Sequence, residues 1–249
     1  MKYRRFGKTE LQMPVFSCGG MRYQHKWEDI DPSEVPDAGQ ANLEATIHRA
    51  LELGINHIET ARGYGSSEMQ LGFVLPRLPR DGIIVQTKIA PFATQKEFLD
   101  TFDKSMSQLQ LDHVDLLSLH GINNAKFLDW SLCKGGCVET IHKLIDEGRV
   151  RHIGFSSHAP AHIIRQAIES DAFQYVNLHW YFVNDLNWSC IDSSWYFSVA
   201  SLASSLLILL SISVRSARSP SIVDSHFWIW PSFRHIVTVS YTHLTLPTK

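Results

Sequence analysis

Short apolar runs recur about every 25–40 residues through the first three quarters of the chain. Runs such as Ile83–Val85 are apolar throughout, which is typical of strands that are covered on both faces. The runs predict six strands, at Pro14–Cys18, Ile55–Glu59, Gly82–Lys88, Val114–His120, Arg151–Ser156 and Tyr175–Tyr181.

Amphipathic segments with helical spacing lie between these runs. Gln40–Leu53 carries apolar residues on one face and is followed by a glycine, a common helix stop. Thr94 and Glu97 form a capping-box pattern that opens a second helix, and Val138–Glu147 predicts a third. Pro160 suits the first turn of a fourth helix, which we expect to run to about residue 170.

This alternation of strands and helices predicts a parallel sheet with right-handed crossovers. A doubly wound nucleotide-binding fold would show a Gly-x-Gly-x-x-Gly turn after its first strand, and the sequence has none. We therefore predict an α/β fold of the (β/α)₈ TIM-barrel type, cut short at about six βα units by residue 188.

Composition changes sharply near Trp188. All 14 glycines and 42 of the 48 charged residues lie in residues 1–188, whereas residues 189–249 contain no glycine and 15 serines. A fold built from tight turns needs glycine where φ is positive. We therefore predict a partial barrel over residues 1–188 and a tail of unrelated composition over residues 189–249.

Net charge and cysteines narrow the function classes. The formal net charge is −2 without a basic block, so nothing indicates nucleic-acid binding. No apolar run follows the first residues as in a secretory signal, which favours a cytoplasmic protein. The one close cysteine pair, Cys133 and Cys137, lacks the second pair that a zinc site needs, so we expect no metal there.

Each later strand ends in ionisable or hydroxylic residues. In a parallel barrel the carboxyl ends of the strands hold the chemistry. These positions are Glu59 with Tyr64 in the loop after it, Lys88, His120, and the pair Ser156 and Ser157. A buried lysine is costly without a carboxylate, and Glu59 on the neighbouring strand is the predicted partner of Lys88.

Four segments in the right order now resemble the aldo-keto reductase family. They are Ile58-Glu-Thr-Ala-Arg-Gly-Tyr-Gly-Ser-Ser-Glu68, Gln86-Thr-Lys88, Leu119-His120 and Ile153-Gly-Phe-Ser-Ser157. The resemblance implies a (β/α)₈ fold that reduces aldehydes and ketones with NADPH, or less often NADH. It covers about residues 1–188 only.

The resemblance also implies roles for the residues at the strand ends. Tyr64 is the expected general acid, Lys88 eases its proton transfer, Glu59 holds Lys88, and His120 orients the substrate carbonyl. Glu59 stands where the family has Asp. Ser156 and Ser157 are expected to contact the nicotinamide, with Ser157 in place of the usual Asn, and Leu178 falls roughly where many members place a Gln.

Purely structural interpretations of the same residues stay open at this point. Tyr64 is then a loop aromatic, Glu59 and Lys88 a structural ion pair, and His120 a core histidine. The other function classes are a non-catalytic barrel that binds a nucleotide or a protein partner, and a membrane-tethered protein. The second would use Trp195–Val214, which has no charged side chain and is long enough to span a bilayer.

For the tail we favour a frameshifted or chimeric reading of the gene over a membrane segment. Val239–Lys249 resembles a translated sequencing adapter. In the resembling family, loops after strands seven and eight hold much of the cofactor, so we expect weak NADPH binding and open edges at the first and sixth strands. The overall prediction is an NADPH-dependent carbonyl reductase acting on a small molecule.

Overall fold

The computed structural model describes residues 1–179 and 241–245. A β-hairpin, β1 with β2, comes first, and six parallel strands, β3 to β8, follow in sequence order across one sheet. The strand bounds are β1 Tyr3–Arg5, β2 Gln12–Pro14, β3 Cys18–Gly19, β4 His57–Glu59, β5 Ile84–Ile89, β6 Val114–Leu119, β7 Val150–Ser157 and β8 Tyr175–His179.

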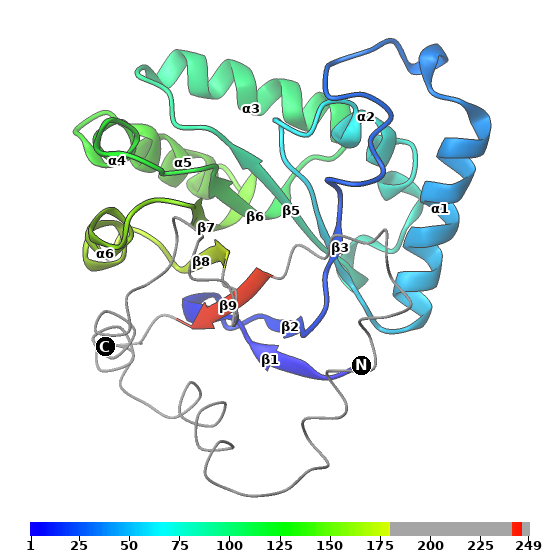
Figure 1. Cartoon of the computed structure of the whole chain (residues 1–249), viewed down its shortest axis with the longest axis horizontal. Coiled ribbons are helices and arrows are strands. Elements are labelled where there is room, and N and C mark those ends of the chain that lie inside the picture. The colour runs from blue at the N-terminus through cyan, green and yellow to red at the C-terminus, as the bar shows by residue number, and fades with distance from the viewer. Residues whose placement is uncertain (180–240, 246–249) are drawn as a thin grey trace, which may run out of the picture.

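The six parallel strands form a curled sheet, a half-barrel, and helices cover its outer side (Figure 1). This confirms the predicted α/β barrel type with about six βα units. The helices are α1 Asp37–Glu52, α2 Ser67–Gly72, α3 Gln95–Leu109, α4 Ala125–Leu132, α5 Cys137–Asp146 and α6 Ala161–Glu169. The cap of α3 is as predicted, since the Thr94 hydroxyl accepts a hydrogen bond from the Glu97 amide.

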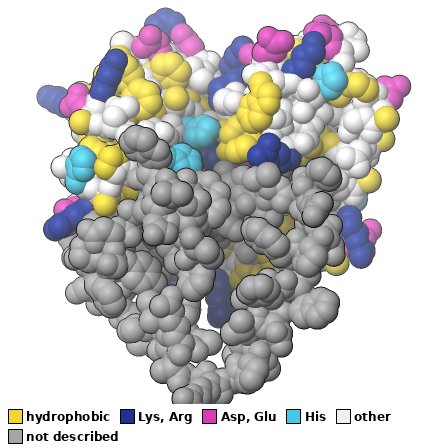
Figure 2. Space-filling model, in the orientation of Figure 1, with side chains coloured by type: hydrophobic (Ala, Val, Ile, Leu, Met, Phe, Trp, Pro, Cys, Tyr) yellow, Lys and Arg dark blue, Asp and Glu magenta, His cyan; other side chains and the backbone are white. Residues whose placement is uncertain are grey.

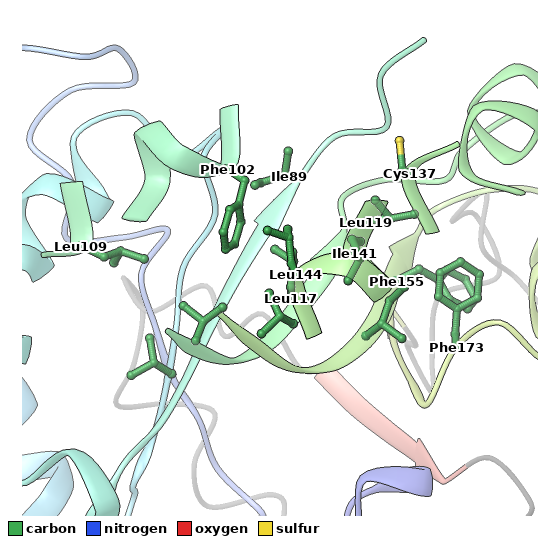
Figure 3. Close-up of a cluster of buried hydrophobic side chains, with 14 of the residues drawn as sticks. Ile89, Phe102, Leu109, Leu117, Leu119, Cys137, Ile141, Leu144, Phe155 and Phe173 are labelled. Carbon is green, nitrogen blue, oxygen red and sulfur yellow. The ribbon is translucent and has the colours of Figure 1, made fainter. Parts of the chain in front are cut away.

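The main apolar core lies between the helices and the outer face of the sheet. Figure 3 shows Phe102 and Leu109 of α3 and Ile141 and Leu144 of α5 facing strand residues such as Leu117. A smaller cluster fills the inner side at the amino ends of the strands, where the hairpin supplies Phe6 and Met13; its members are Phe6, Met13, Ile84, Leu116 and Tyr175. The hairpin thus closes the amino end of the half-barrel.

The first strand and the sheet edge differ from the sequence prediction. The expected strand Pro14–Cys18 is divided, because residues up to Pro14 pair in the hairpin and the sheet begins only at Cys18. Residues Tyr241–Thr245 form β9, which pairs antiparallel with β8. The predicted open edge on the sixth strand is therefore wrong, since the backbone groups of β8 are paired. β9 is no seventh βα unit, because it runs antiparallel.

Gly154 of β7 makes room for the largest side chain of the inner cluster. A Cβ at Gly154 would lie 2.4 Å from the ring of Tyr175, and Tyr175 is fully buried. No real Cβ approaches carbon atoms that closely, so a side chain here would push the ring off Ser118, to which its hydroxyl is hydrogen-bonded.

We expect Gly154→Ala to lower the free energy of unfolding by about 1–3 kcal/mol through this overpacking. Gly39→Ala is the matched control, because a Cβ at Gly39 in α1 meets nothing within 4 Å. The control should be neutral or stabilising by up to about 1 kcal/mol. Urea unfolding followed by circular dichroism measures both. Equal midpoints for the two variants would contradict this account of Gly154.

Candidate active site

Register places Glu59, Lys88 and Ser156 on one inner surface of the half-barrel. Side chains alternate along a strand, so Gln86 and Lys88 of β5 share a face, as do Ser118 of β6 and His120 directly after it. Lys88 pairs with Ser118 across the two strands, and Glu59 of β4 pairs with Gln86. The predicted residues therefore meet at the carboxyl ends of neighbouring strands.

Glu59 and Lys88 form a buried ion pair, as the sequence predicted. The Lys88 Nζ contacts Glu59 Oε1, and both side chains are at most 2% exposed. The ammonium also donates a hydrogen bond to the Thr60 carbonyl at 2.9 Å. Burial lowers the pKa of Lys88 well below its ordinary value, while the carboxylate of Glu59 favours the charged form. Glu59 is one methylene longer than the Asp of the family, and it still contacts Lys88.

The Lys88 ammonium of this pair lies over the face of the Tyr64 ring. The Lys88 Nζ is 4.6 Å from the centroid of the Tyr64 ring, and Tyr64 is 5% exposed. The loop that carries it continues the pairing of β4 with β5, since the Thr60 and Arg62 amides donate to the carbonyls of Gln86 and Lys88. The segment before Tyr64 is thus hydrogen-bonded to β5, which fixes where the ring lies.

Gly65 lets a second loop reach Tyr64. It has a φ of +53°, and a Cβ there would lie 2.1 Å from the Lys26 carbonyl. Lys26 belongs to the β3–α1 loop (residues 20–36), which also carries Trp27. Trp27 is 61% exposed, and its ring meets the Tyr64 ring edge-on with centroids 6.5 Å apart. Sequence reasoning missed this aromatic wall, because loop residues have no periodicity to reveal what they face.

His120 approaches Tyr64 from the other side. The two rings are edge-on, with centroids 5.6 Å apart, and the His120 amide donates to the Ile89 carbonyl at 2.7 Å. Burial lowers the pKa of His120 to about 3, with smaller effects from the charges of Lys88 and His158. The imidazole is therefore neutral near pH 7 and has one N–H to donate.

The two serines of β7 face opposite sides of the sheet. Ser157 donates to the Ile122 carbonyl at 2.7 Å and accepts from the Ala159 amide at 3.0 Å, so its hydroxyl is held by backbone. Ser156 accepts from the Gly121 amide at 3.1 Å, and among the described residues its own hydroxyl proton has no recorded acceptor. The nicotinamide contact predicted for each serine stays a prediction.

A buried polar layer below the ion pair was missed by the sequence analysis. The Gln86 amide donates to Ser118 Oγ and to Asn177 Oδ1, at 2.8 Å each, and Gln86 Oε1 lies 3.0 Å from His57 Nε2. Asn177 pairs in register with Ser156, while Leu178 packs in the outer core. Asn177 Nδ2 is buried without a recorded acceptor among the described residues. The inner polar position of β8 is thus Asn177, one residue before Leu178.

Most of the polar site is buried, since Glu59 and Lys88 are each 1% exposed and Tyr64 is 5% exposed. In the view of Figure 2, histidine and basic side chains lie near the centre of the molecule, beside residues drawn in grey. The site combines a buried cation, a phenol over it, a neutral imidazole and an inward amide donor. Together these groups can hold a carbonyl oxygen and deliver a proton to it.

The family model described as "Aldo/keto reductase family" matches residues 16–187, more than half of the chain. The chain belongs to the aldo/keto reductase family. The matched segment contains the ion pair, Tyr64, His120 and Ser156, so the expected family is confirmed. It ends one residue before the change in composition at Trp188.

Curated relatives in this family are reductases and dehydrogenases. L-galactose dehydrogenase from Arabidopsis thaliana is 35% identical over 121 residues, which cover 45% of this chain and 37% of the relative. L-glyceraldehyde 3-phosphate reductase from Escherichia coli strain K12 is 24% identical, over 64% of this chain and 46% of the relative. The chain thus spans less than half the length of these two aldo-keto reductases.

Solved aldo-keto reductases share the fold. The holo form of an enzyme from Bacillus halodurans superposes with a TM-score of 0.59 at 23% identity, covering 72% of this chain and 58% of that one. An enzyme from Bombyx mori in complex with NADP gives a TM-score of 0.53 at 18% identity, with 72% and 58% covered. At these identities the likeness establishes the barrel fold only.

Two further sequence predictions concern membranes and metals. In the part of the chain that the structure describes, no helix is long and apolar enough to cross a bilayer. The segment Trp195–Val214 lies outside the described residues. Over residues 1–179 and 241–245, no three His, Cys, Asp or Glu side chains come together as a metal site would require.

The lowered pKa of His120 makes a testable prediction about titration and stability. We expect the His120 NMR signal, assigned with His120→Asn, to stay unshifted between pH 5 and 8, whereas histidines of the urea-unfolded chain titrate near pH 6.5. Below pH 6.5 the unfolded chain takes up a proton that folded His120 does not. This effect lowers the free energy of unfolding by up to about 1.4 kcal/mol per pH unit as the pH falls toward 3. A midpoint near 6.5 in the folded protein would contradict the buried neutral imidazole.

Proposed function

We propose that this aldo-keto reductase reduces an aldehyde or ketone to an alcohol with NADPH, or with NADH. The observation that carries the proposal is the convergence of Tyr64, Lys88 and His120 at the carboxyl ends of the strands. A fold alone does not imply a reaction, but three groups suited to one proton transfer support it.

Tyr64 acts as the general acid and gives its proton to the carbonyl oxygen. A free phenol titrates near pH 10 and is a weak acid at neutral pH. The Lys88 ammonium, 4.6 Å from the ring centroid, stabilises the phenolate that remains. Glu59 acts through Lys88, because the buried carboxylate keeps the ammonium charged and in place. His120 donates its one N–H to the carbonyl oxygen and orients it.

Residues of β7 and β8 on the inner side of the half-barrel suit the carboxamide group of a nicotinamide. Ser156 and Asn177 pair in register on β7 and β8, and each has a donor without a recorded acceptor in the described part of the chain. A carboxamide oxygen accepts from such donors, and we propose that they hold it. When bound, the dinucleotide supplies the hydride. A nearby aromatic wall, Trp27, limits the substrate on its other side.

The substrate is proposed to be a small carbonyl compound. The two relatives bear the names of enzymes for L-galactose and L-glyceraldehyde 3-phosphate, which supports the sugar-aldehyde class as a first choice. The proposal places the reaction in the cytoplasm. Among the described residues, Cys18, Cys133 and Cys137 are free thiols, and a reducing compartment keeps them so.

Tyr64→Phe separates the reductase from a non-catalytic barrel that binds a nucleotide or a partner. In the reductase we expect NADPH-dependent turnover of a small aldehyde to fall by at least about 100-fold, because the proton donor is lost. NADPH affinity should change little. Tyr3→Phe is the control, since Tyr3 lies in the hairpin, where its hydroxyl donates a hydrogen bond to the Gly54 carbonyl. Unchanged turnover in Tyr64→Phe would contradict the proposed role.

Ser156→Ala and Ser157→Ala form a matched pair. We expect Ser156→Ala to weaken NADPH binding about 3- to 10-fold, the worth of one hydrogen bond, with little change in stability. Ser157→Ala should lower the free energy of unfolding by about 1–3 kcal/mol, because it leaves the buried Ile122 carbonyl and Ala159 amide without this partner. Fluorescence titration with NADPH and urea unfolding measure the two effects. The reverse assignment would show that Ser157 holds the cofactor.

A further inference from the structure

Arg62, two residues before Tyr64, joins three parts of the structure through one guanidinium group. Its Nη1 donates to Glu68 Oε2 of α2 at 2.6 Å and also to Gln108 Oε1 of α3. Its Nη2 contacts Asp29 Oδ1 in the β3–α1 loop. The Arg62 side chain is only 14% exposed and Glu68 is fully buried, so that contact is shielded from water, whereas Asp29 is 37% exposed.

The Glu68 end of this network reaches the strand of the catalytic lysine. Glu68 is fully buried, and its other oxygen, Oε1, accepts from the Thr87 hydroxyl at 2.6 Å. Thr87 immediately precedes Lys88 on β5, and its side chain points to the opposite face. The residues that flank Tyr64 and Lys88 are therefore held to each other on the side of the sheet away from the substrate.

The Asp29 end reaches the loop that covers the site. Asp29 also pairs with Lys104 and accepts from Gln108 Nε2, both on α3. Nearby in the same loop, the His25 amide donates to Ser66 Oγ at 3.0 Å, and Lys26 accepts from the Ser66 amide at 3.0 Å. The loop therefore lies against the segment that carries Tyr64, with Trp27 edge-on to the Tyr64 ring.

We propose that Arg62 is a positioning residue of the active site, which fixes both the Tyr64 phenol and the Trp27 wall through Glu68 and Asp29. The Arg62 guanidinium contacts neither the side chains of the ion pair nor the His120 imidazole in the contacts described, so it acts through the loops. The expected effect of Arg62 on turnover rests on the proposed reductase function. The mechanical link between Arg62 and the β3–α1 loop does not depend on it.

The shape of arginine explains why this residue type stands here. A guanidinium is planar and offers five N–H donors in fixed directions, so it serves Glu68, Asp29 and Gln108 at once. A lysine ammonium is a compact charge on a flexible stem and cannot hold the three acceptors in one plane. Arg62→Lys should therefore keep the charge but fail to restore the geometry.

The test compares Arg62→Gln and Arg62→Lys with Arg80→Gln. Arg80 is a matched control because it pairs with the buried Asp115 at 2.7 Å at the opposite, amino end of β5. Asp29→Asn is a second variant, which weakens the loop contact by removing its negative charge, at a residue that is 37% exposed. Hydrogen–deuterium exchange over residues 22–30 and steady-state reduction of a small aldehyde with NADPH are measured for each full-length variant.

We expect exchange over residues 22–30 to rise at least tenfold in Arg62→Gln, Arg62→Lys and Asp29→Asn, and less than twofold in Arg80→Gln. The Arg62 variants should lose about 10- to 100-fold in kcat through misplacement of the phenol. Asp29→Asn, which weakens only the contact of the loop, should chiefly raise KM. Unchanged exchange in these variants, or equal effects in Arg80→Gln, would overturn the role of Arg62. An inactive wild-type chain would refute the proposed reductase function. Hydrogen–deuterium exchange alone would then decide whether Arg62 holds the β3–α1 loop.

Discussion

The buried ion pair between Glu59 and Lys88 is the interaction on which the rest of the site depends. Two charges taken out of water need each other and further polar partners, or the structure pays several kcal/mol for each. The structure meets this need with the Thr60 carbonyl on Lys88 and with a sheet register that brings β4 and β5 to the same level. Tyr64 then lies over the ammonium because its loop continues that pairing. The position of the phenol is a consequence of how the charge pair is accommodated.

The inner side of the half-barrel is layered from apolar to ionisable along the strands. Phe6, Met13 and Tyr175 fill the amino end, and the amides and hydroxyls of Gln86, Ser118 and Asn177 follow in a connected network. Glu59, Lys88 and His120 come last, where the strands end. Each layer supports the next, since buried polar groups are stable only when they are hydrogen-bonded. The outer side of the same strands is a conventional helix-packed core, so stability and chemistry use opposite faces.

Much of this organisation follows from the sequence, for physical reasons that also explain what it does not reveal. Apolar runs predicted the strands from β4 to β8 because those strands are covered on both faces. A buried lysine without a counter-charge is unfavourable in free energy, and this predicted Glu59 as the partner of Lys88. The hairpin was missed because its exposed β1 has no apolar pattern, and α2 because six residues are too few to show helical spacing. The sequence comparison pointed to Leu178 instead of its neighbour Asn177, because a shift of one residue moves a side chain to the other face of a strand. The network of Arg62 and the pairing of β9 with β8 join residues distant in sequence, which no local pattern encodes.

Transfer of deuterium tests the central claim, carbonyl reduction at this site, most directly. The full-length protein is incubated with NADPH deuterated at the nicotinamide C4 and with glyceraldehyde, and the product is examined by mass spectrometry and NMR. The account predicts an alcohol that carries one deuterium on the former carbonyl carbon in the wild type, and none above background in Lys88→Met, where the charge over which Tyr64 lies is removed. Absence of deuterated alcohol from the wild type, or equal labelling by Lys88→Met, would contradict it.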